Sequence, residues 1–317
     1  MSAIIGSGNF KYEALDSWPI LPGDARLQET PGVAVDSRDQ VYIFSRNEDN
    51  PVMVFDTGGN FLRGFGKGMF SNRTHGIHIG PDDTVFCVDD GIHTITKFTS
   101  EGELLMTIGT HGQSTEKWKG DPFNRPTHAA VSRQTGHIYI TDGYGNFRVH
   151  KYTGDGEHVK SWGEPGIAPG QFMRPHNIAV DADDRVIVAD REAHRVQVFD
   201  TDGNVLDVWN NIFLPNGMTI APDGNIYIGE LPGMTNEEPT PPNMGHNISV
   251  ISPKGELLAR FGHPDEGEEP GKFIAPHGIG VDSHGSIYVG EVSFTIRGSK
   301  MDPPKELRSL SKLQKIS

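Results

Sequence analysis

The hydrophobic positions of this chain fall in short alternating runs that are separated by turn residues. The segment PHNIAVDADDRVIVADR, which begins at residue 175, reads as an apolar strand, an Asp-rich turn and a second apolar strand. Five other segments repeat this phrase, and the six copies begin near residues 31, 74, 126, 175, 215 and 276. In most copies a third strand, such as RVQVFD, leads through a Gly turn to a fourth, such as VLDVWN. The pattern therefore predicts four short antiparallel strands in each copy.

Six four-stranded units at intervals of roughly 40 to 50 residues are typical of a β-propeller. We therefore predict an all-β chain, in which residues 1–317 form a single six-bladed β-propeller domain. The sixth copy lacks its own third and fourth strands, so residues near FKYEAL or LRSLSKLQKI are expected to complete it, and which terminus closes the blade is left open. A short helix is the alternative for the last segment, and we favour a strand. The polar, Pro-rich residues 231–247 are expected to form a loop inserted in the fifth blade.

One column of the repeat contains a candidate metal site. The residue just before the first apolar run is histidine in copies two, four and six and another residue type in the other copies: Pro31, His75, Thr127, His176, Asn216 and His277. In a six-bladed ring, alternate blades are about 120° apart, and their innermost strands start around one central channel. A single histidine beside proline is usually a surface residue, but this alternation favours three converging imidazoles. Three neutral histidines suit Zn²⁺ best, with Fe²⁺, Mn²⁺ and Co²⁺ as alternatives.

The residues after the second strand of each copy include candidate catalytic groups. Five copies have an acid there, and we interpret it as an acceptor for backbone N–H groups of a neighbouring turn. The next position holds Arg46 in copy one and Arg191 in copy four. These arginines could bind a substrate carboxylate through two hydrogen bonds each, and salt bridges to the acids are the alternative. In copy three, Gly-Tyr-Gly places Tyr144 in a tight loop that can project it toward the channel.

Composition narrows the expected partners and compartment. The net charge of −14 provides no basic stripe for a nucleic acid. Cys87 is the only cysteine, so the chain can form no internal disulfide or thiolate cluster, which fits a reducing compartment. No signal peptide and no apolar run of about 20 residues is present. We therefore expect a cytoplasmic protein that acts on a small molecule without binding a membrane, and the oligomeric state is left open.

At these positions the chain resembles the peptidyl-α-hydroxyglycine α-amidating lyases, which are six-bladed propellers of NHL-like repeats. The resemblance runs from GVAVDSRDQVYIFSR to PHGIGVDSHGSIYVGE and includes the motifs TDGYGNFRV, RPHNIAV and VADRE. It implies that Zn²⁺ is held by His75, His176 and His277. It also implies that Tyr144 is the catalytic tyrosine and that Arg46 and Arg191 are the active-site arginines.

Two departures from the family lie beside the last histidine. The family's acid after this ligand, which is linked to a structural Ca²⁺, is Gly278 here, and a methionine two residues before the ligand is Ala275. The family's disulfide cysteines, monooxygenase half and secretion signal also have no counterpart in this sequence. We therefore expect a cytoplasmic, bacterial-type relative without the Ca²⁺ site.

The resemblance implies a metal-dependent lyase that splits a carbinolamide, R–CO–NH–CH(OH)–COO⁻, into an amide and glyoxylate. The substrate would be a small α-hydroxy acid derivative that carries a carboxylate. Tyr144 would accept the hydroxyl proton and Arg191 would hold the carboxylate, although Arg46 and Arg191 could exchange roles. One alternative is a hydrolase, lactonase or hydratase in which the same histidines hold a metal that activates water. A second is an NHL-type propeller without enzymatic activity that binds a partner on its face.

Overall fold

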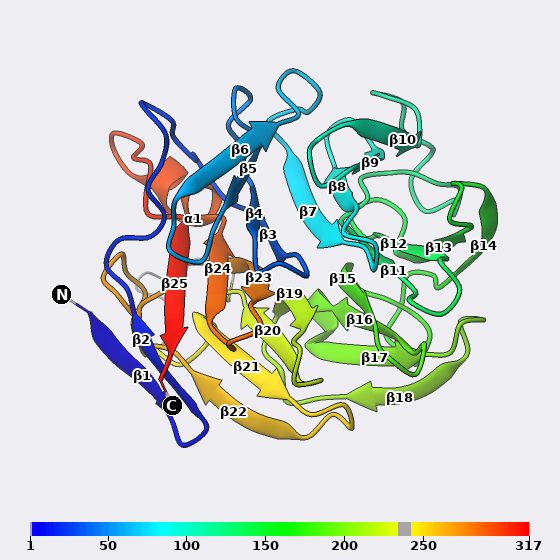
Figure 1. The fold of residues 1–317 in the computed structure, drawn as a ribbon. Coiled ribbons are helices and arrows are strands. Elements are labelled where there is room, and N and C mark those ends of the chain that lie inside the picture. Colours follow the sequence, from blue (N-terminus) through cyan, green and yellow to red (C-terminus); the bar gives the residue numbers. More distant parts are fainter. Residues whose placement is uncertain (1, 234–241, 317) are drawn as a thin grey trace. The chain divides into compact units, whose positions relative to one another are not determined.

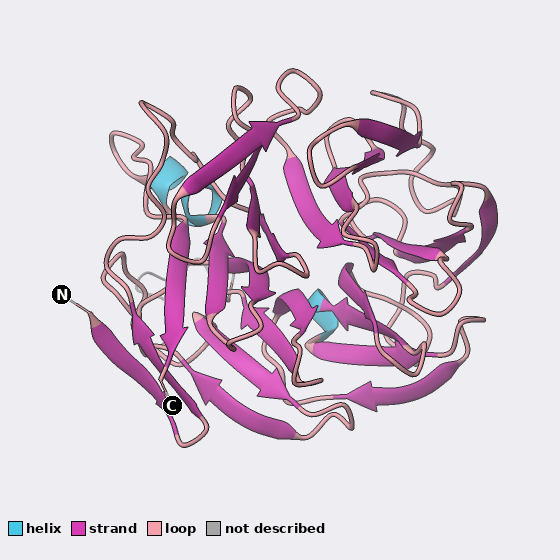
Figure 2. Cartoon of the chain, viewed as in Figure 1, coloured by secondary structure: helices cyan, strands magenta, loops and turns pink. Residues whose placement is uncertain are grey.

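Strands make up nearly all of the regular structure in this computed structural model, which describes residues 2–233 and 242–316 (Figure 2). Within those ranges the helices are short: η1 (Arg191–Ala193), α1 (Ser293–Ile296) and η2 (Gly298–Lys300). The strands form six antiparallel sheets, one for each copy of the repeat (Figure 1). The fold is a six-bladed β-propeller, which confirms the prediction from the sequence.

Residues 65–215 form one of two compact units and contain three sheets of four strands. Each strand pairs with its neighbour in the sequence, as expected for strands joined by tight turns (Figure 1). The twelve strands are β7 (Thr74–Ile79), β8 (Val85–Asp89), β9 (Thr94–Phe98), β10 (Leu104–Ile108), β11 (His128–Val131), β12 (Ile138–Asp142), β13 (Arg148–Tyr152), β14 (His158–Trp162), β15 (Pro175–Val180), β16 (Val186–Asp190), β17 (Arg195–Phe199) and β18 (Val205–Trp209).

The other unit comprises residues 1–64 and 216–317. Two further four-stranded sheets are β3 (Gly32–Val35), β4 (Val41–Phe44), β5 (Val52–Phe55) and β6 (Phe61–Phe65), and β19 (Pro215–Ile220), β20 (Ile226–Glu230), β21 (Asn247–Ile251) and β22 (Leu257–Phe261). The expected insertion at residues 231–247 has its centre, residues 234–241, outside the described residues.

The sixth sheet brings both ends of the chain together (Figure 1). Its strands lie in the order β1 (Ala3–Ser7), β2 (Phe10–Ala14), β25 (Leu310–Lys315), β24 (Ile287–Glu291) and β23 (Pro276–Val281). Both terminal segments named in the sequence analysis are thus strands of this sheet, and the helical alternative for the last segment is wrong. Leu313 pairs with Ala14 on one side and with Ile287 on the other, so β25 is hydrogen-bonded along both edges.

Apolar side chains between neighbouring sheets form the core of each unit. In the unit of residues 65–215, Phe86 and Val88 of β8 pack with Ile138 and Ile140 of β12. Phe123, in the loop before β11, belongs to the same cluster. Burial of each such side chain contributes about 1.5–3 kcal/mol. Neighbouring sheets therefore pack face to face, and the innermost strand β11 contacts both β7 and β15.

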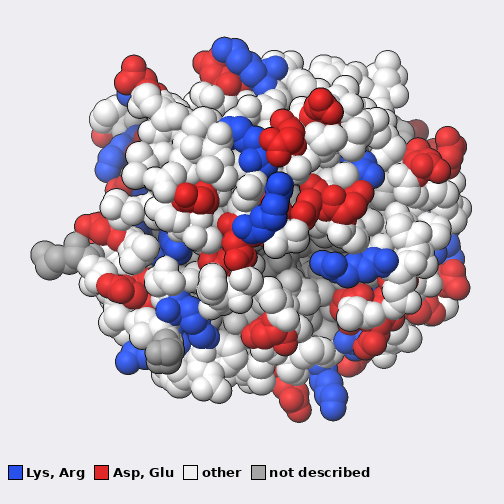
Figure 3. All heavy atoms as spheres, in the orientation of Figure 1, with Lys and Arg blue, Asp and Glu red and all other residues white. Residues whose placement is uncertain are grey.

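Charged side chains are distributed over the surface. On the face shown in Figure 3, the described Lys and Arg side chains are interspersed with Asp and Glu and form no continuous basic area. In the described part of the chain, no helix combines the length and the apolar character that crossing a membrane requires.

Candidate functional site

The unit of residues 65–215 brings Tyr144 against two of the predicted histidines. His75 lies near the start of β7, His176 near the start of β15, and Tyr144 follows β12. The Tyr144 hydroxyl lies 2.9 Å from His75 Nε2 and 3.1 Å from His176 Nε2. The two imidazole rings have centroids 4.8 Å apart. Three residues that are far apart in the sequence therefore present their polar atoms to one point.

A close backbone approach places the Tyr144 loop. A Cβ atom at Gly143 would lie 2.0 Å from the carbonyl oxygen of Pro175, the residue before His176. Only glycine allows this contact, because any side chain would overlap the backbone of β15. The glycine before Tyr144 thus positions the phenol beside His176, as the Gly-Tyr-Gly sequence suggested.

Backbone carbonyl groups determine which ring nitrogen carries the proton in two of the histidines. His75 Nδ1 lies 2.6 Å from the carbonyl oxygen of Thr127, and within the other unit His277 Nδ1 lies 2.6 Å from that of Pro31. A carbonyl oxygen can only accept, so each Nδ1 carries the proton and Nε2 keeps its lone pair. Thr127 and Pro31 belong to the same column of the repeat as the histidines. This arrangement is the usual outer support of an imidazole that binds metal through Nε2.

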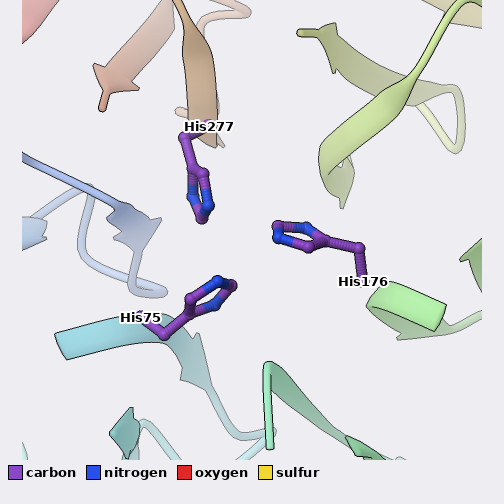
Figure 4. A group of neighbouring side chains, drawn as sticks. All are labelled: His75, His176 and His277. Atoms are coloured by element: carbon purple, nitrogen blue, oxygen red, sulfur yellow. The ribbon is translucent and has the colours of Figure 1, made fainter. Parts of the chain in front are cut away.

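The three histidines of the column could hold a metal ion. One ring nitrogen each from His75, His176 and His277 lies within 4.8 Å of the others, and all three side chains are buried (Figure 4). A set of neutral imidazole nitrogens fits Zn²⁺ or another divalent transition metal.

Arg191 lies beside Tyr144 within the same unit. It opens η1 directly after β16, its side chain is only 4% exposed, and its guanidinium carbon lies 5.8 Å from the centroid of the Tyr144 ring. Its Nη2 donates to Glu192 at 2.9 Å. Burial opposes the charged form of Arg191, but Tyr144 and Glu192 outweigh this effect and raise the pKa of its guanidinium.

Arg46 is part of the other unit and is also ion-paired. Its Nη1 donates to Glu29 and, at 2.9 Å, to the Thr295 hydroxyl. Glu29 also accepts from Thr295, so the carboxylate joins Arg46 to the start of α1. The carboxylates Glu29 and Glu192 that pair with these arginines do not belong to the acids that follow the second strands.

Those acids have the structural role that the sequence analysis assigned to them. Asp142 accepts the backbone N–H of Asn124 at 2.8 Å, and Asp190 accepts that of Arg174 at 2.9 Å. Glu291 accepts from the backbone of Ala275 at 2.8 Å. Burial raises the pKa of Glu291 to about 7. Each carboxylate ties the end of a second strand to the loop that enters its own blade.

Two arginines beside Tyr144 were not singled out from the sequence. The guanidinium carbon of Arg125 lies 4.6 Å from the centroid of the Tyr144 ring, and that of Arg174 lies at 5.4 Å. A signal for them exists in the repeat. Arg73, Arg125 and Arg174 stand two residues before the histidine column in copies two, three and four.

Comparisons with known proteins agree with the fold. The NHL repeat matches residues 123–152 and 172–199. Human NHL repeat-containing protein 3 is 36% identical over 62% of this chain and 60% of its own length. Peptidyl-alpha-hydroxyglycine alpha-amidating lyase 1 of Drosophila melanogaster is 29% identical over 72% of this chain and 44% of its own length. The chain thus spans about half the length of these relatives.

Among solved structures, a streptogramin B lyase superposes with a TM-score of 0.63 over 92% of this chain and 95% of its own. Because the two sequences are only 14% identical, the likeness concerns the fold alone. The repeats, the six sheets and the named relatives point to one group of proteins. The chain is a six-bladed propeller with NHL repeats, and it is similar to proteins named peptidyl-alpha-hydroxyglycine alpha-amidating lyase.

Proposed function

We propose that this chain is a metal-dependent lyase that breaks the C–N bond of a carbinolamide-type α-hydroxy acid derivative. The reaction converts R–CO–NH–CH(OH)–COO⁻ into R–CO–NH₂ and glyoxylate. The observation that carries the proposal is the position of the Tyr144 hydroxyl, within hydrogen-bonding distance of the Nε2 atoms of His75 and His176. A divalent ion bound by His75, His176 and His277 would supply Lewis-acid polarisation of the substrate hydroxyl.

Tyr144 is the proposed base. As a phenolate it accepts the proton of the substrate hydroxyl, the C–N bond breaks as the aldehyde forms, and the phenol then returns the proton to the amide nitrogen. The step consumes no water and leaves no net charge on the protein. The guanidiniums of Arg125, Arg174 and Arg191 lie 4.6–5.8 Å from the centroid of the Tyr144 ring and place positive charge beside the proposed base. Tyr144 is partly exposed, so a substrate can reach it.

Arg191 is the proposed binder of the substrate carboxylate. Its hydrogen bonds to Glu192 hold the guanidinium in place, and burial keeps it in surroundings where a charge-assisted hydrogen bond is strong. Arg46 is the second candidate because its bond to Glu29 fixes it in the same way. Replacing each by lysine keeps the charge but removes the planar fork, so the carboxylate binder is the one whose lysine variant raises KM more.

The test of the site combines metal content with turnover. Purified protein should contain roughly one divalent transition metal per chain, and His176→Ala should lose it. His284→Ala is the matched control, since His284 is an exposed turn residue whose side chain is 76% accessible. Tyr144→Phe should keep the metal and lose turnover by about 10²–10⁴-fold. A Tyr144→Phe variant with wild-type turnover would rule out the assigned base.

The products separate a lyase from a hydrolase. With an N-acyl-α-hydroxyglycine substrate in H₂¹⁸O, the lyase yields an unlabelled amide, while the aldehyde oxygen of glyoxylate exchanges with water in either case. A hydrolase would instead yield the carboxylic acid with one solvent oxygen. Mass spectrometry of the acyl product distinguishes the two, and a labelled acid would refute the lyase proposal.

A further inference from the structure

Three arginines line one side of the candidate site from the same position of consecutive repeats. Arg73, Arg125 and Arg174 precede the histidine column by two residues in the three copies of the unit of residues 65–215. The corresponding residues of the other unit are Glu29, Leu214 and Ala275. Lys and Arg together are only 28 of 317 residues, and the chain is acidic overall. Strand pairing does not require an arginine here, since half of the copies lack one.

In this region two carboxylates, Asp90 and Glu192, form ion pairs with four arginine side chains. Arg73 holds Asp90 through two hydrogen bonds of 2.6 and 2.8 Å, so Arg125 reaches the same carboxylate only at 3.3 Å. On the other side, Glu192 accepts from Arg191 at 2.9 Å and pairs with Arg174 at 3.1 Å. Arg191 lies among these groups, so four positive charges face two negative ones. The tyrosinate and one substrate carboxylate would offset two charges, and a bound divalent ion would add more.

Arg125 and Arg174 retain unused donors. All side-chain hydrogen bonds recorded for Arg125 within the described chain come from Nη2, and Arg174 Nε is buried with no partner among the described residues. The two side chains are 36% and 31% exposed, whereas that of Arg191 is 4% exposed. A ligand approaching Tyr144 can therefore reach Arg125 and Arg174 without displacing a complete ion pair.

Backbone contacts fix the main-chain positions from which these two arginine side chains extend over the phenol. Arg125 has a φ of +64°, a left-handed conformation that costs energy in a non-glycine residue, and its N–H donates to His93 Nδ1 at 3.1 Å. The N–H of Arg174 donates to Asp190 at 2.9 Å. Both side chains therefore start from fixed main-chain positions, and their guanidiniums lie 4.6 and 5.4 Å from the centroid of the Tyr144 ring.

We propose that Arg125 and Arg174 form a second anion-binding subsite, so that the ligand of this site carries a carboxylate on its acyl side in addition to its α-carboxylate. The inference rests on the proposed function, in which Arg191 or Arg46 takes the α-carboxylate. A planar carboxylate matches the two-donor edge of a guanidinium, and the subsite selects a dianionic α-hydroxyglycine derivative over a neutral-acyl one.

The test measures binding separately from turnover. N-succinylglycine carries the second carboxylate, N-succinamoylglycine replaces it with a neutral amide, and neither can react because both lack the hydroxyl. Isothermal titration calorimetry on the metal-loaded protein should give a Kd about 10- to 100-fold lower for the succinyl ligand. Arg125→Gln/Arg174→Gln should lose this preference, and Arg125→Lys/Arg174→Lys should keep part of it. Arg133→Gln, an exposed arginine between β11 and β12, is the matched control and should keep it fully.

The binding and turnover results test the anion subsite and the lyase proposal separately. Equal affinity of the wild-type protein for the two ligands, or an unchanged preference in the double glutamine variant, would overturn the subsite. Turnover of the hydroxylated pair is then measured on the same samples. A binding preference without release of glyoxylate would overturn the lyase proposal and leave the anion subsite standing. Turnover of both substrates with equal kcat/KM would leave the lyase and remove the subsite.

Discussion

Replacing Gly278 with alanine tests how the backbone supports the last histidine. Gly278 follows His277 in β23, at the position where the resembling family has an acid. A Cβ atom built there would lie 2.6 Å from the backbone nitrogen of Val33 and 2.9 Å from the carbonyl oxygen of Pro31. The same Pro31 oxygen accepts the hydrogen bond of His277 Nδ1. The added methyl group therefore pushes on the strand that orients this imidazole.

The expected losses of stability and of metal affinity in Gly278→Ala follow from these contacts. A carbon atom packs at about 3.5–4.0 Å from its neighbours, so a contact of 2.6 Å requires β3 to move by nearly 1 Å. Overpacking of this kind costs about 1–3 kcal/mol of stability. Loss of the outer hydrogen bond to a metal-binding imidazole lowers metal affinity by about 10- to 100-fold. Gly278→Asp should also lower stability and metal affinity, and it should not create a Ca²⁺ site.

Two assays measure the effect. Urea unfolding monitored by tryptophan fluorescence gives the change in stability, and competition with a chelator gives the metal affinity. Gly58→Ala is the matched control because the Cβ atom there would meet only the side chains of Asp56 and Asn60. Gly278→Ala with stability within about 0.5 kcal/mol of wild type and unchanged metal affinity would refute the reasoning.

Three further predictions concern buried polar groups. Thr127→Val removes a hydroxyl that lies 3.2 Å from Pro175 O and 2.8 Å from Thr141 Oγ1, so it should cost about 1–3 kcal/mol in urea unfolding, and Thr127→Ser should recover most of this. Burial raises the pKa of Glu291 from 4.5 to about 7, so its contribution to stability, about 3 kcal/mol, is present below pH 4.5 and is lost as pH rises through 7. Glu291→Gln should therefore reduce the loss of stability between pH 5 and 8, and an unchanged pH profile would contradict this. Burial lowers the pKa of His128 from 6.5 to about 4, so its contribution is present above pH 6.5 and is lost as pH falls through 4. His128→Asn should then shift the acid-unfolding midpoint to lower pH, which circular dichroism would detect.

The repeats made much of the fold predictable from the sequence. Alternating residues such as those of VIVAD and IYIGE determine which side of a strand is buried, and the Asp and Gly turns determine where each strand ends. The histidine column could also be identified from the sequence, because equivalent positions of a repeat lie at equivalent places in a ring. The arginine column of Arg73, Arg125 and Arg174 carried the same kind of signal. Arginine is common on protein surfaces, so three arginines at one repeat position indicate a site less strongly than three histidines do.

The tertiary structure alone decided the contacts between residues of different repeats. The pairing of β25 with β2 joins segments about 300 residues apart, and local periodicity contains no information on such a pairing. The ion-pair partners Glu29 and Glu192 depend on side-chain directions in irregular loops, which no repeat pattern specifies. The convergence of Tyr144 with His75 and His176 likewise depends on the packing of three sheets. Sequence periodicity thus determined the strands and the candidate ligands, whereas packing determined which polar atoms meet, because a hydrogen bond depends on a few tenths of an ångström that only the assembled core defines.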